Sequence, residues 1–118
     1  MSDRSDPVWK ALADPTRRKI LDLLREGPRG TTDIVEQFPD LTRFAVMKHL
    51  DVLREANLVR TRSAGRRRIN SLNVAPLRQV IERWIHKYEA YWTNTLLRVK
   101  DDAESATDAK RKRKRRRA

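Results

Sequence analysis

Breaks at short intervals limit what the first forty residues of this chain can fold into. Asp6-Pro7 and Asp14-Pro15 each place a capping carboxylate directly before a proline, which is a signal for the start of a helix. Gly27-Pro28 and Pro39-Asp40 are signals for the end of one. The sequence therefore predicts a series of short helices separated by tight breaks.

Apolar spacing defines the first two of these helices. The helix that begins at Asp6-Pro7 has three large apolar residues roughly on one face, namely Val8, Trp9 and Leu12. The helix after Asp14 directs a set of aliphatic residues inward, namely Ile20, Leu21, Leu23 and Leu24.

The next two helices are expected at about Thr32–Phe38 and Thr42–Glu55. Thr31 or Thr32 offers an N-cap for the first of them, and Thr42 offers one for the second. Val46, Leu50 and Leu53 form the buried stripe of the second helix, and Asn57 stands where a left-handed C-cap is expected. Two short helices joined by a tight break predict a helix-turn-helix, whose second helix reads DNA.

The pattern changes after Asn57. Residues 58–63 and 67–72 partly alternate between polar and apolar, which predicts a β-hairpin with Gly65 at the turn. Asn73 and Pro76 open a last helix with a long apolar stripe at spacings of three and four: Leu77, Val80, Ile81, Trp84, Ile85, Tyr88, Trp92, Leu96 and Val99. The predicted fold class is mostly α with a small β-hairpin, a winged helix-turn-helix.

Three segments are expected. Residues 1–5 form a flexible N-terminus, and residues 6–100 form the DNA-binding and dimerisation domain. Residues 101–118 form a disordered basic tail, because they hold too little apolar surface to fold against anything.

Residues of the reading helix that lie off its buried stripe are candidates for contact with DNA. Arg43 is the best candidate for reading a base, since a guanidinium can pair with guanine through two hydrogen bonds. Phe44 or Met47 can touch a thymine methyl group, Lys48 can meet a phosphate, and Thr42 can cap the helix and also bind a phosphate. Each has a simpler alternative: helix capping for Thr42, packing for Phe44, and a solvated surface for Arg43 and Lys48. His49 adjoins the buried stripe, and core packing is the alternative there.

The predicted hairpin is crowded with arginines: Arg60, Arg62, Arg66, Arg67 and Arg68. Arg60 and Arg62 share one strand face, and Arg66 and Arg68 share another. A wing with these side chains beside a reading helix can follow the DNA backbone or enter the minor groove. A merely solvated, charged hairpin is the alternative.

The overall charge agrees with a nucleic-acid partner. The chain has 28 basic and 16 acidic residues, and its net charge is +12. Eight of the basic residues are consecutive, from Lys110 to Arg117, and without them the net charge would be +4. Such an excess indicates a polyanion, with nucleic acid the first candidate and an anionic membrane the second. The basic run either binds DNA without sequence preference or serves only as a solubilising end.

Several function classes are excluded or disfavoured. The chain has no cysteine, which excludes disulfides, thiolate metal sites and thiol chemistry. No apolar stretch approaches the roughly 20 residues of a membrane span, and the first residues lack the apolar core of a secretion signal. We therefore expect a cytoplasmic protein with no membrane partner. No phosphate-binding glycine loop or nucleophile motif is present, so we expect no enzyme and no cofactor.

Two segments resemble the ArsR family of bacterial winged-helix repressors, namely KALADPTRRKIL and KHLDVLREANLV. The resemblance covers about residues 8–97. It implies a homodimer that represses transcription from an inverted-repeat operator, and it assigns DNA contacts to Thr42, Arg43, Phe44, Met47, Lys48 and His49. It also implies a dimer interface made by the first and last helices, here Val8, Trp9, Leu12, Ile81, Trp84, Tyr88, Trp92 and Leu96.

The chain departs from the metal-sensing members that it resembles. The family's cysteine site is impossible here. A second family site consists of an acidic residue and a histidine, followed later in the chain by His-x-x-Glu. Here His86 and Glu89 match the second half, but Asn73 and Ala75 stand at the two positions of the first half. We therefore expect no metal, and the sequence identifies no inducer. The competing functions are a charge-driven general nucleic-acid or RNA binder and a dimeric interaction module that has lost DNA binding.

Overall fold

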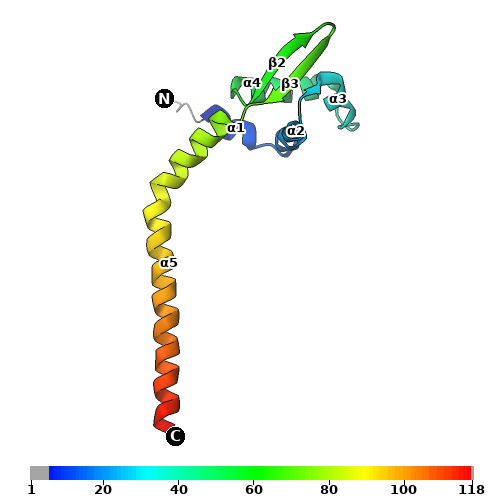
Figure 1. Cartoon of the computed structure of the whole chain (residues 1–118). Coiled ribbons are helices and arrows are strands. Elements are labelled where there is room, and N and C mark those ends of the chain that lie inside the picture. Colours follow the sequence, from blue (N-terminus) through cyan, green and yellow to red (C-terminus); the bar gives the residue numbers. More distant parts are fainter. Residues whose placement is uncertain (1–5, 118) are drawn as a thin grey trace. The chain divides into compact units, whose positions relative to one another are not determined.

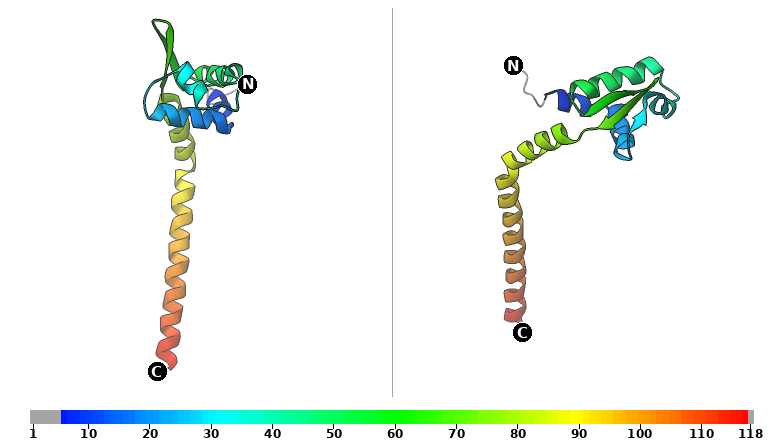
Figure 2. Two further views of the ribbon diagram at one scale, coloured as in Figure 1. Left: turned by 90° about the vertical axis from the view of Figure 1, so that its right-hand side faces the viewer. Right: turned by 45° about the horizontal axis from the view of Figure 1, so that its top comes forward.

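The computed structural model describes residues 6–117, with the side chains of the last two of these left out. The expectation of a flexible N-terminus concerns residues 1–5, which lie outside that range. The chain divides into two compact units, one ending at Ile81 and the other beginning at Glu82. Figures 1 and 2 show the path of the chain.

The first unit opens with the helices that the proline signals predict. These are α1 (Asp6–Leu12) and α2 (Pro15–Arg25). Asp14 caps α2, since its carboxylate accepts hydrogen bonds from the backbone N–H groups of Thr16 and Arg17 at 2.8 and 3.2 Å. Gly27 follows α2 with a φ of +143°, which confirms the predicted break.

The predicted helix-turn-helix is present as α3 (Thr31–Glu36) and α4 (Arg43–Glu55). Thr42 caps α4, and Asn57 adopts a φ of +59° after it, as expected. The predicted cap of α3 is wrong: Gly30 is the N-cap and supplies no side-chain hydrogen bond. The helix also begins and ends earlier than the expected range of Thr32–Phe38, and the Thr31 hydroxyl accepts a hydrogen bond from Asn70.

The wing is a hairpin of β2 (Val59–Ala64) and β3 (Arg67–Leu72), and it projects beyond the helices (Figures 1 and 2). Its turn holds Gly65 and Arg66, and the φ of +62° at Gly65 is one that favours glycine. The sequence did not predict β1 (Arg29–Gly30), which pairs antiparallel with β3 and makes a sheet of order β1-β3-β2.

One apolar core holds the first unit together. It joins α1, α2, α3, α4, the start of β2 and the first turns of α5, through the residues Val8, Ala11, Ile20, Leu21, Leu24, Ile34, Val46, Leu50, Leu53, Ala56, Leu58, Val59 and Val80. Burial of the Val46, Leu50 and Leu53 stripe fixes which side of α4 faces outward.

The last helix, α5, spans Ala75–Arg117 and forms the whole described part of the second unit. The structure differs here from the expectation of a disordered tail after residue 100. Two features explain a helix: no glycine or proline follows Pro76, and alanines recur through residues 103–109. Lys100 and Glu104 also pair across one turn, with 4.0 Å between Nζ and Oε1.

Candidate nucleic-acid interface

The N-terminal end of α4 is open to solvent. The hydroxyl of Thr42 accepts a hydrogen bond from the backbone N–H of Ala45 at 3.1 Å, so this residue is a true cap. The side chains of Thr42, Arg43 and Phe44 are all exposed. The first turn of the helix therefore presents donors and an aromatic ring where a major-groove reader makes its base contacts.

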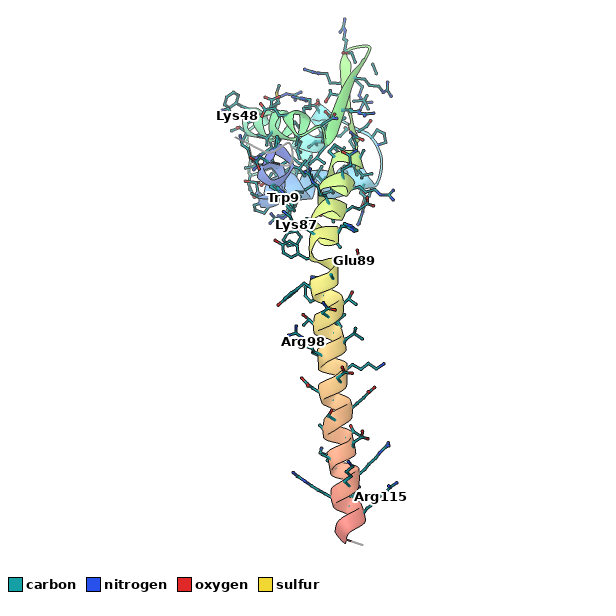
Figure 3. The ribbon with its side chains drawn as sticks, turned by 90° about the vertical axis from the view of Figure 1, so that its left-hand side faces the viewer. Trp9, Lys48, Lys87, Glu89, Arg98 and Arg115 are labelled. Atoms are coloured by element: carbon teal, nitrogen blue, oxygen red, sulfur yellow. The ribbon has the colours of Figure 1, made fainter. Side chains whose placement is uncertain are left out.

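Phe44 and Lys48 form a pair on the outer face of α4. The ring of Phe44 is 68% exposed, so it is no part of the protomer's core. The Lys48 ammonium lies 4.6 Å from the centre of this ring, a cation–π contact that fixes both side chains one turn apart. Figure 3 shows Lys48 at the edge of the unit.

His49 is directed away from these residues. Its Nδ1 lies 3.3 Å from Nη1 of Arg17, whose Nε and Nη2 donate to the carbonyls of Ala11 and Lys10 at 2.9 and 2.8 Å. The imidazole thus belongs to a contact among α1, α2 and α4. The structure does not place it beside Arg43 and Phe44.

Asp14 lies near the same contact. Burial by itself raises the pKa of this carboxyl group. The backbone hydrogen bonds from Arg17 and Thr16 and the nearby charges of His49 and Arg17 lower the pKa by more, so it lies below its usual value. The ionised cap is thereby stabilised in the folded protein.

A basic cleft lies between the reading helix and the wing. Its volume is about 220 Å³, and we define it by its lining: Gly30, Thr31, Thr32, Arg43, Met47, Leu50, Arg54, Arg66, Arg67 and Arg68. Five arginines line it, and two of them are paired with carboxylates (Arg54 with Asp51, Arg67 with Asp33), so the cleft keeps a net positive charge. Phosphate and carboxylate groups match the geometry of guanidinium donors, so the cleft suits an anionic ligand.

Contacts with α3 position two of these arginines. Nη2 of Arg67 lies 2.9 Å from the carboxylate of Asp33, an ion pair that ties the wing to α3. Nη2 of Arg43 donates to the Thr32 hydroxyl at 3.4 Å. Gly30 leaves room for this arrangement, because a Cβ there would lie 2.9 Å from Nη2 of Arg67.

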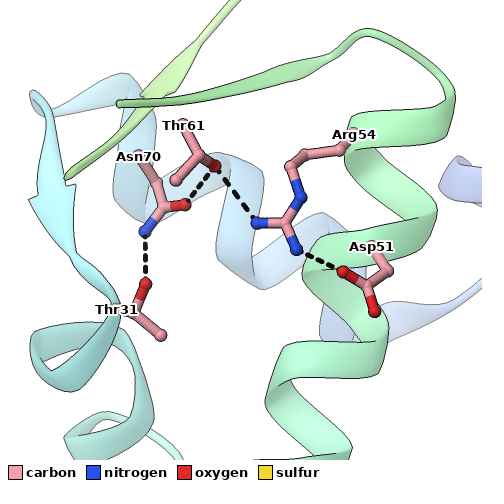
Figure 4. Close-up of polar contacts among 5 residues, drawn as sticks. All are labelled: Thr31, Asp51, Arg54, Thr61 and Asn70. Atoms are coloured by element: carbon pink, nitrogen blue, oxygen red, sulfur yellow. Dashed lines mark hydrogen bonds and ion pairs between the residues drawn. The ribbon is translucent and has the colours of Figure 1, made fainter. Parts of the chain in front are cut away.

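A hydrogen-bond network behind the cleft joins the reading helix to the wing (Figure 4). Arg54 pairs with Asp51 on α4 and donates to the Thr61 hydroxyl on β2 at 3.1 Å. That hydroxyl donates to Oδ1 of Asn70 at 2.7 Å, and Nδ2 of Asn70 donates to the Thr31 hydroxyl at 3.0 Å. Four elements (α3, α4, β2 and β3) are thus held by one chain of side chains.

Asn70 is the centre of this network. It is fully buried, and its Nδ2 also lies 3.3 Å from the carbonyl of Arg29 on β1. A buried amide without partners would be costly, and this one has three. Asn70, Arg54 and Asp33 were not among the residues predicted for this site, and Thr31 and Thr32 were predicted only as possible helix caps. The one sequence signal for Asn70 is a polar residue at an inward-facing strand position.

The strand register separates the arginines of the wing into two groups. Arg68 lies opposite Ser63, on the face that also carries Thr61 and Asn70. Arg60 and Arg62 alternate with Thr61 and therefore lie on the other face of the hairpin. Arg67 pairs with Ala64 and shares the face of Arg60 and Arg62, yet it lines the basic cleft together with Arg66 and Arg68, whereas Arg60 and Arg62 do not.

The residues predicted for a dimer interface have different surroundings. Val8 is 2% exposed and packs in the protomer's own core, and Leu12 is partly buried against that core, so Val8 is not available to a partner. Trp9 is partly exposed. Large apolar residues are exposed along α5, both the predicted ones and others: Ile81, Trp84, Ile85, Tyr88, Tyr91, Trp92, Leu96, Leu97 and Val99.

Three residues at the positions of the family's second metal site, His86, Glu89 and Asn73, contact other residues of the chain. His86 and Glu89 are both exposed and lie 3.2 Å apart on α5. The Asn73 amide donates to the carbonyl of Asn57 at 2.8 Å, which closes the loop after α4. Over residues 6–117, no group of three or more potential ligands is brought together. No helix in that range is both long and apolar enough to cross a membrane.

The fold and this site define a class of protein. A capped reading helix and an arginine-rich wing, joined through a basic cleft, are the features of a winged helix-turn-helix DNA-binding regulator. Residues 12–62 match the family model described as "Helix-turn-helix domain".

Known proteins extend this result over most of the chain. The "HTH-type transcriptional regulator Rv2034" of Mycobacterium tuberculosis is 39% identical over 94 residues, which cover 77% of this chain and 80% of that protein. The "Transcriptional repressor SdpR" of Bacillus subtilis is 39% identical over 74 residues, which cover 63% and 81%. The crystal structure titled "ArsR family transcriptional regulator, RHA00566" aligns with a TM-score of 0.70 at 30% identity, covering 77% of this chain and 98% of that one.

The chain belongs to the ArsR family of winged helix-turn-helix transcriptional regulators. The resemblance of its KALADPTRRKIL and KHLDVLREANLV segments to that family is confirmed. Transcriptional regulators of this family are not enzymes, in agreement with the expectation from the sequence.

Proposed function

We propose that this regulator is a homodimeric repressor that binds an inverted-repeat operator. The observation that carries the proposal is the basic cleft between α4 and the wing, where both DNA-reading elements meet. A surface of this kind can follow one strand of a duplex from the major groove, filled by α4, to the wing.

Residue roles follow from this arrangement. Arg43 reads a base edge in the major groove from the first turn of α4, and Met47 and Phe44 contact apolar groups there. Lys48 binds a phosphate from its place over the Phe44 ring. Thr42 remains the cap and also contacts the backbone. His49 has no direct contact with DNA and instead holds α4 against α2 through Arg17.

The wing contacts the DNA backbone on both of its faces. Arg66, Arg67 and Arg68 bind phosphates from the side of the cleft. Arg60 and Arg62 bind from the face of the hairpin opposite to Arg68, because the strand alternation directs them there. Contacts of this kind fix the position of the protein on the duplex but carry little information on sequence.

An exposed apolar stripe on α5 supports the dimer. The exposed apolar residues Ile81, Trp84, Tyr88, Trp92, Leu96 and Val99 recur at spacings of three and four, so they share one side of the helix. Trp84 and Tyr88 already contact each other, with ring centres 5.0 Å apart. An exposed apolar stripe of this length indicates an interface, and a second copy satisfies it with twofold symmetry.

Binding to an operator also explains repression. A dimer on an operator excludes other proteins from that DNA, which is the simplest form of repression, and the name of the Bacillus subtilis relative gives the same role. A regulator of this kind works where the DNA is, so we place it in the bacterial cytoplasm.

Selection of bound duplexes from a random pool tests the proposal. We expect an inverted repeat whose half-sites lie about one helical turn apart, or a multiple of it, because the two reading helices of a twofold dimer must enter successive major grooves. An Arg43→Ala variant carried through the same selection serves as the control and should lose the preference at one position of each half-site. A selected pool without symmetry, or without any consensus, would refute the proposal.

A further inference from the structure

The end of α5 carries a segment that the operator-binding surface does not use. Lys110–Arg117 is a run of eight consecutive cations at the end of the helix, which we call the cationic segment. Successive residues of a helix point about 100° apart, so eight of them over two turns place positive charge on every side. Residues 110–115 are all exposed, and Figure 3 shows the side chain of Arg115 extending from the helix.

The charges of this segment are not balanced within the protein. Four carboxylates stand just before it, at positions 101, 102, 104 and 108, but only Asp108 lies one turn from cations of the segment, at Arg111 and Lys112. Across the described side chains 110–115, the structure shows no ion pair. Most cations there have other cations at i±3 and i±4, and like charges at this spacing oppose helix formation.

A polyanion removes this repulsion, and the surrounding chemistry selects DNA over other polyanions. A helix that lies in a membrane surface needs an apolar face, and the cationic segment has no apolar residue. The helix-turn-helix unit belongs to the same chain, so a duplex bound there is tethered to the segment, and such a link raises the effective concentration of phosphates. Each phosphate contact also releases counterions, so the interaction is favourable at low and moderate salt.

We propose that Lys110–Arg117 is a second DNA-binding element, which contacts phosphates next to the operator without sequence preference and is stabilised as a helix when bound. The inference rests on the proposed function, because an operator-bound first unit supplies the neighbouring DNA. It adds affinity and association rate but no discrimination among sequences, since phosphate contacts carry no base information.

Salt titration of the full chain against two variants tests this element. One variant replaces every Lys and Arg of the segment by Gln, which keeps its length and helix propensity but removes its charge. The matched control replaces the arginines of the segment by Lys, which keeps the charge. Binding is measured on a duplex that contains the selected operator with long flanks and on a scrambled duplex of equal length, between about 50 and 200 mM salt.

The Gln variant should show a weaker salt dependence on both duplexes. The slope of log Kobs against log salt is negative, and its magnitude should decrease by up to about 7 for each protomer, at about 0.9 per phosphate neutralised. The Lys variant should keep the slope of the full chain. The ratio of operator to scrambled affinity should stay the same in all three proteins. Circular dichroism should show helix gained on addition of DNA in the full chain but not in the Gln variant.

Two results would overturn the inference. One is a slope that changes by less than about one in the Gln variant. The other is that the full chain binds vesicles of anionic phosphatidylserine more tightly than the scrambled duplex at equal salt, which would assign the segment to membranes. The proposed function fails separately: it fails when the full chain shows no preference for the operator, whatever the slopes are.

Discussion

Asn70 shows how much of this interface depends on one buried side chain. Its amide group contacts β1, β2 and α3, and through Thr61 it reaches Arg54 on the reading helix. None of these partners is a neighbour in the sequence. The orientation of the wing against α4 therefore depends on polar contacts as well as on the apolar core.

We expect Asn70→Ala to destabilise the first unit by about 1–3 kcal/mol, because it removes a buried amide that bonds the half-buried Thr61 and Thr31 hydroxyls. Urea denaturation gives this value, and operator binding under conditions where the variant is folded should also weaken. Ser63→Ala, an exposed change on β2, is the control and should alter stability by no more than about 0.5 kcal/mol. Equal stability of the two variants would show that the network contributes nothing.

Asp14 gives a second prediction at this scale. Its pKa is lowered in the folded protein, so the charged cap stabilises the fold above the ordinary pKa of an aspartate, about 3.9, and this contribution is lost as the pH falls through the lowered pKa. Asp14→Asn retains a capping oxygen but not the charge. The stability difference between wild type and Asp14→Asn should therefore shrink as the pH falls below about 5.

Urea midpoints at neutral and at acidic pH measure that difference. Asp14→Ala is the companion variant, and it should cost about 1 kcal/mol at neutral pH because it removes the cap itself. A difference between wild type and Asp14→Asn that grows on acidification would contradict the assigned cause.

At the scale of elements, the helices could be predicted and their polar connections could not. Capping residues and apolar periodicity act within a few positions of the chain, so α2, α4 and the hairpin turn at Gly65 were predicted nearly as observed. The strand β1 has two residues and exists through its pairing with β3, some 40 residues later. No local pattern can indicate an element of that kind.

The same limit applies to the predictions for the site. His49 was grouped with the DNA contacts because of its position on α4, but its partner Arg17 lies on another helix. Five arginines marked the wing, but the register with β3 alone does not decide which of them line the cleft: Arg67 shares the face of Arg60 and Arg62 and reaches the cleft beside Asp33 of α3. Thr31 was expected to cap α3, and Asn70 competes for its hydroxyl.

The reading helix and the wing should fail in different ways when their arginines are removed. Arg43→Ala should cost about 1–3 kcal/mol on the operator and relax the preference at one base position, with little effect on scrambled DNA. Competition assays with operators varied at each position measure this effect. An equal loss on every duplex would refute a reading role for Arg43.

Removal of Arg66 and Arg68 together should weaken operator and scrambled DNA alike. Both side chains line the basic cleft, where we expect phosphates, so the salt slope should fall by about 2 for each protomer. Arg25→Ala, an exposed change on α2, is the control and should leave the slope unchanged. A change of sequence preference without a change of slope would contradict the assignment.

At the scale of the whole molecule, the two units differ in construction. The first unit carries the cleft and the core, and the second is a single helix with an apolar stripe followed by cations. The apolar stripe was predicted from the spacing of its residues, and the run of cations is visible in the sequence itself. The sequence did not predict a helix through the cations, because a charged stretch that packs against nothing resembles a disordered tail.

Substitutions on α5 should distinguish the dimer interface from the rest of the helix surface. Tyr88→Glu together with Leu96→Glu places charges on the stripe, and we expect dimer dissociation to be at least about tenfold easier, because a buried unpaired carboxylate is costly. Leu97→Glu, on the other side of the helix, should leave the dimer intact. Sedimentation equilibrium checks both; a stable dimer of the double variant would exclude this stripe as the interface.

The central claim is that α4, supported by the wing, recognises a specific DNA sequence. Affinity for the selected operator and for a scrambled duplex of equal length and flanks, both at about 150 mM salt, measures this most directly. We predict a preference of about 10³ or more for the operator. Equal affinity for the two duplexes would contradict the account and would leave a protein that binds DNA through its charge alone.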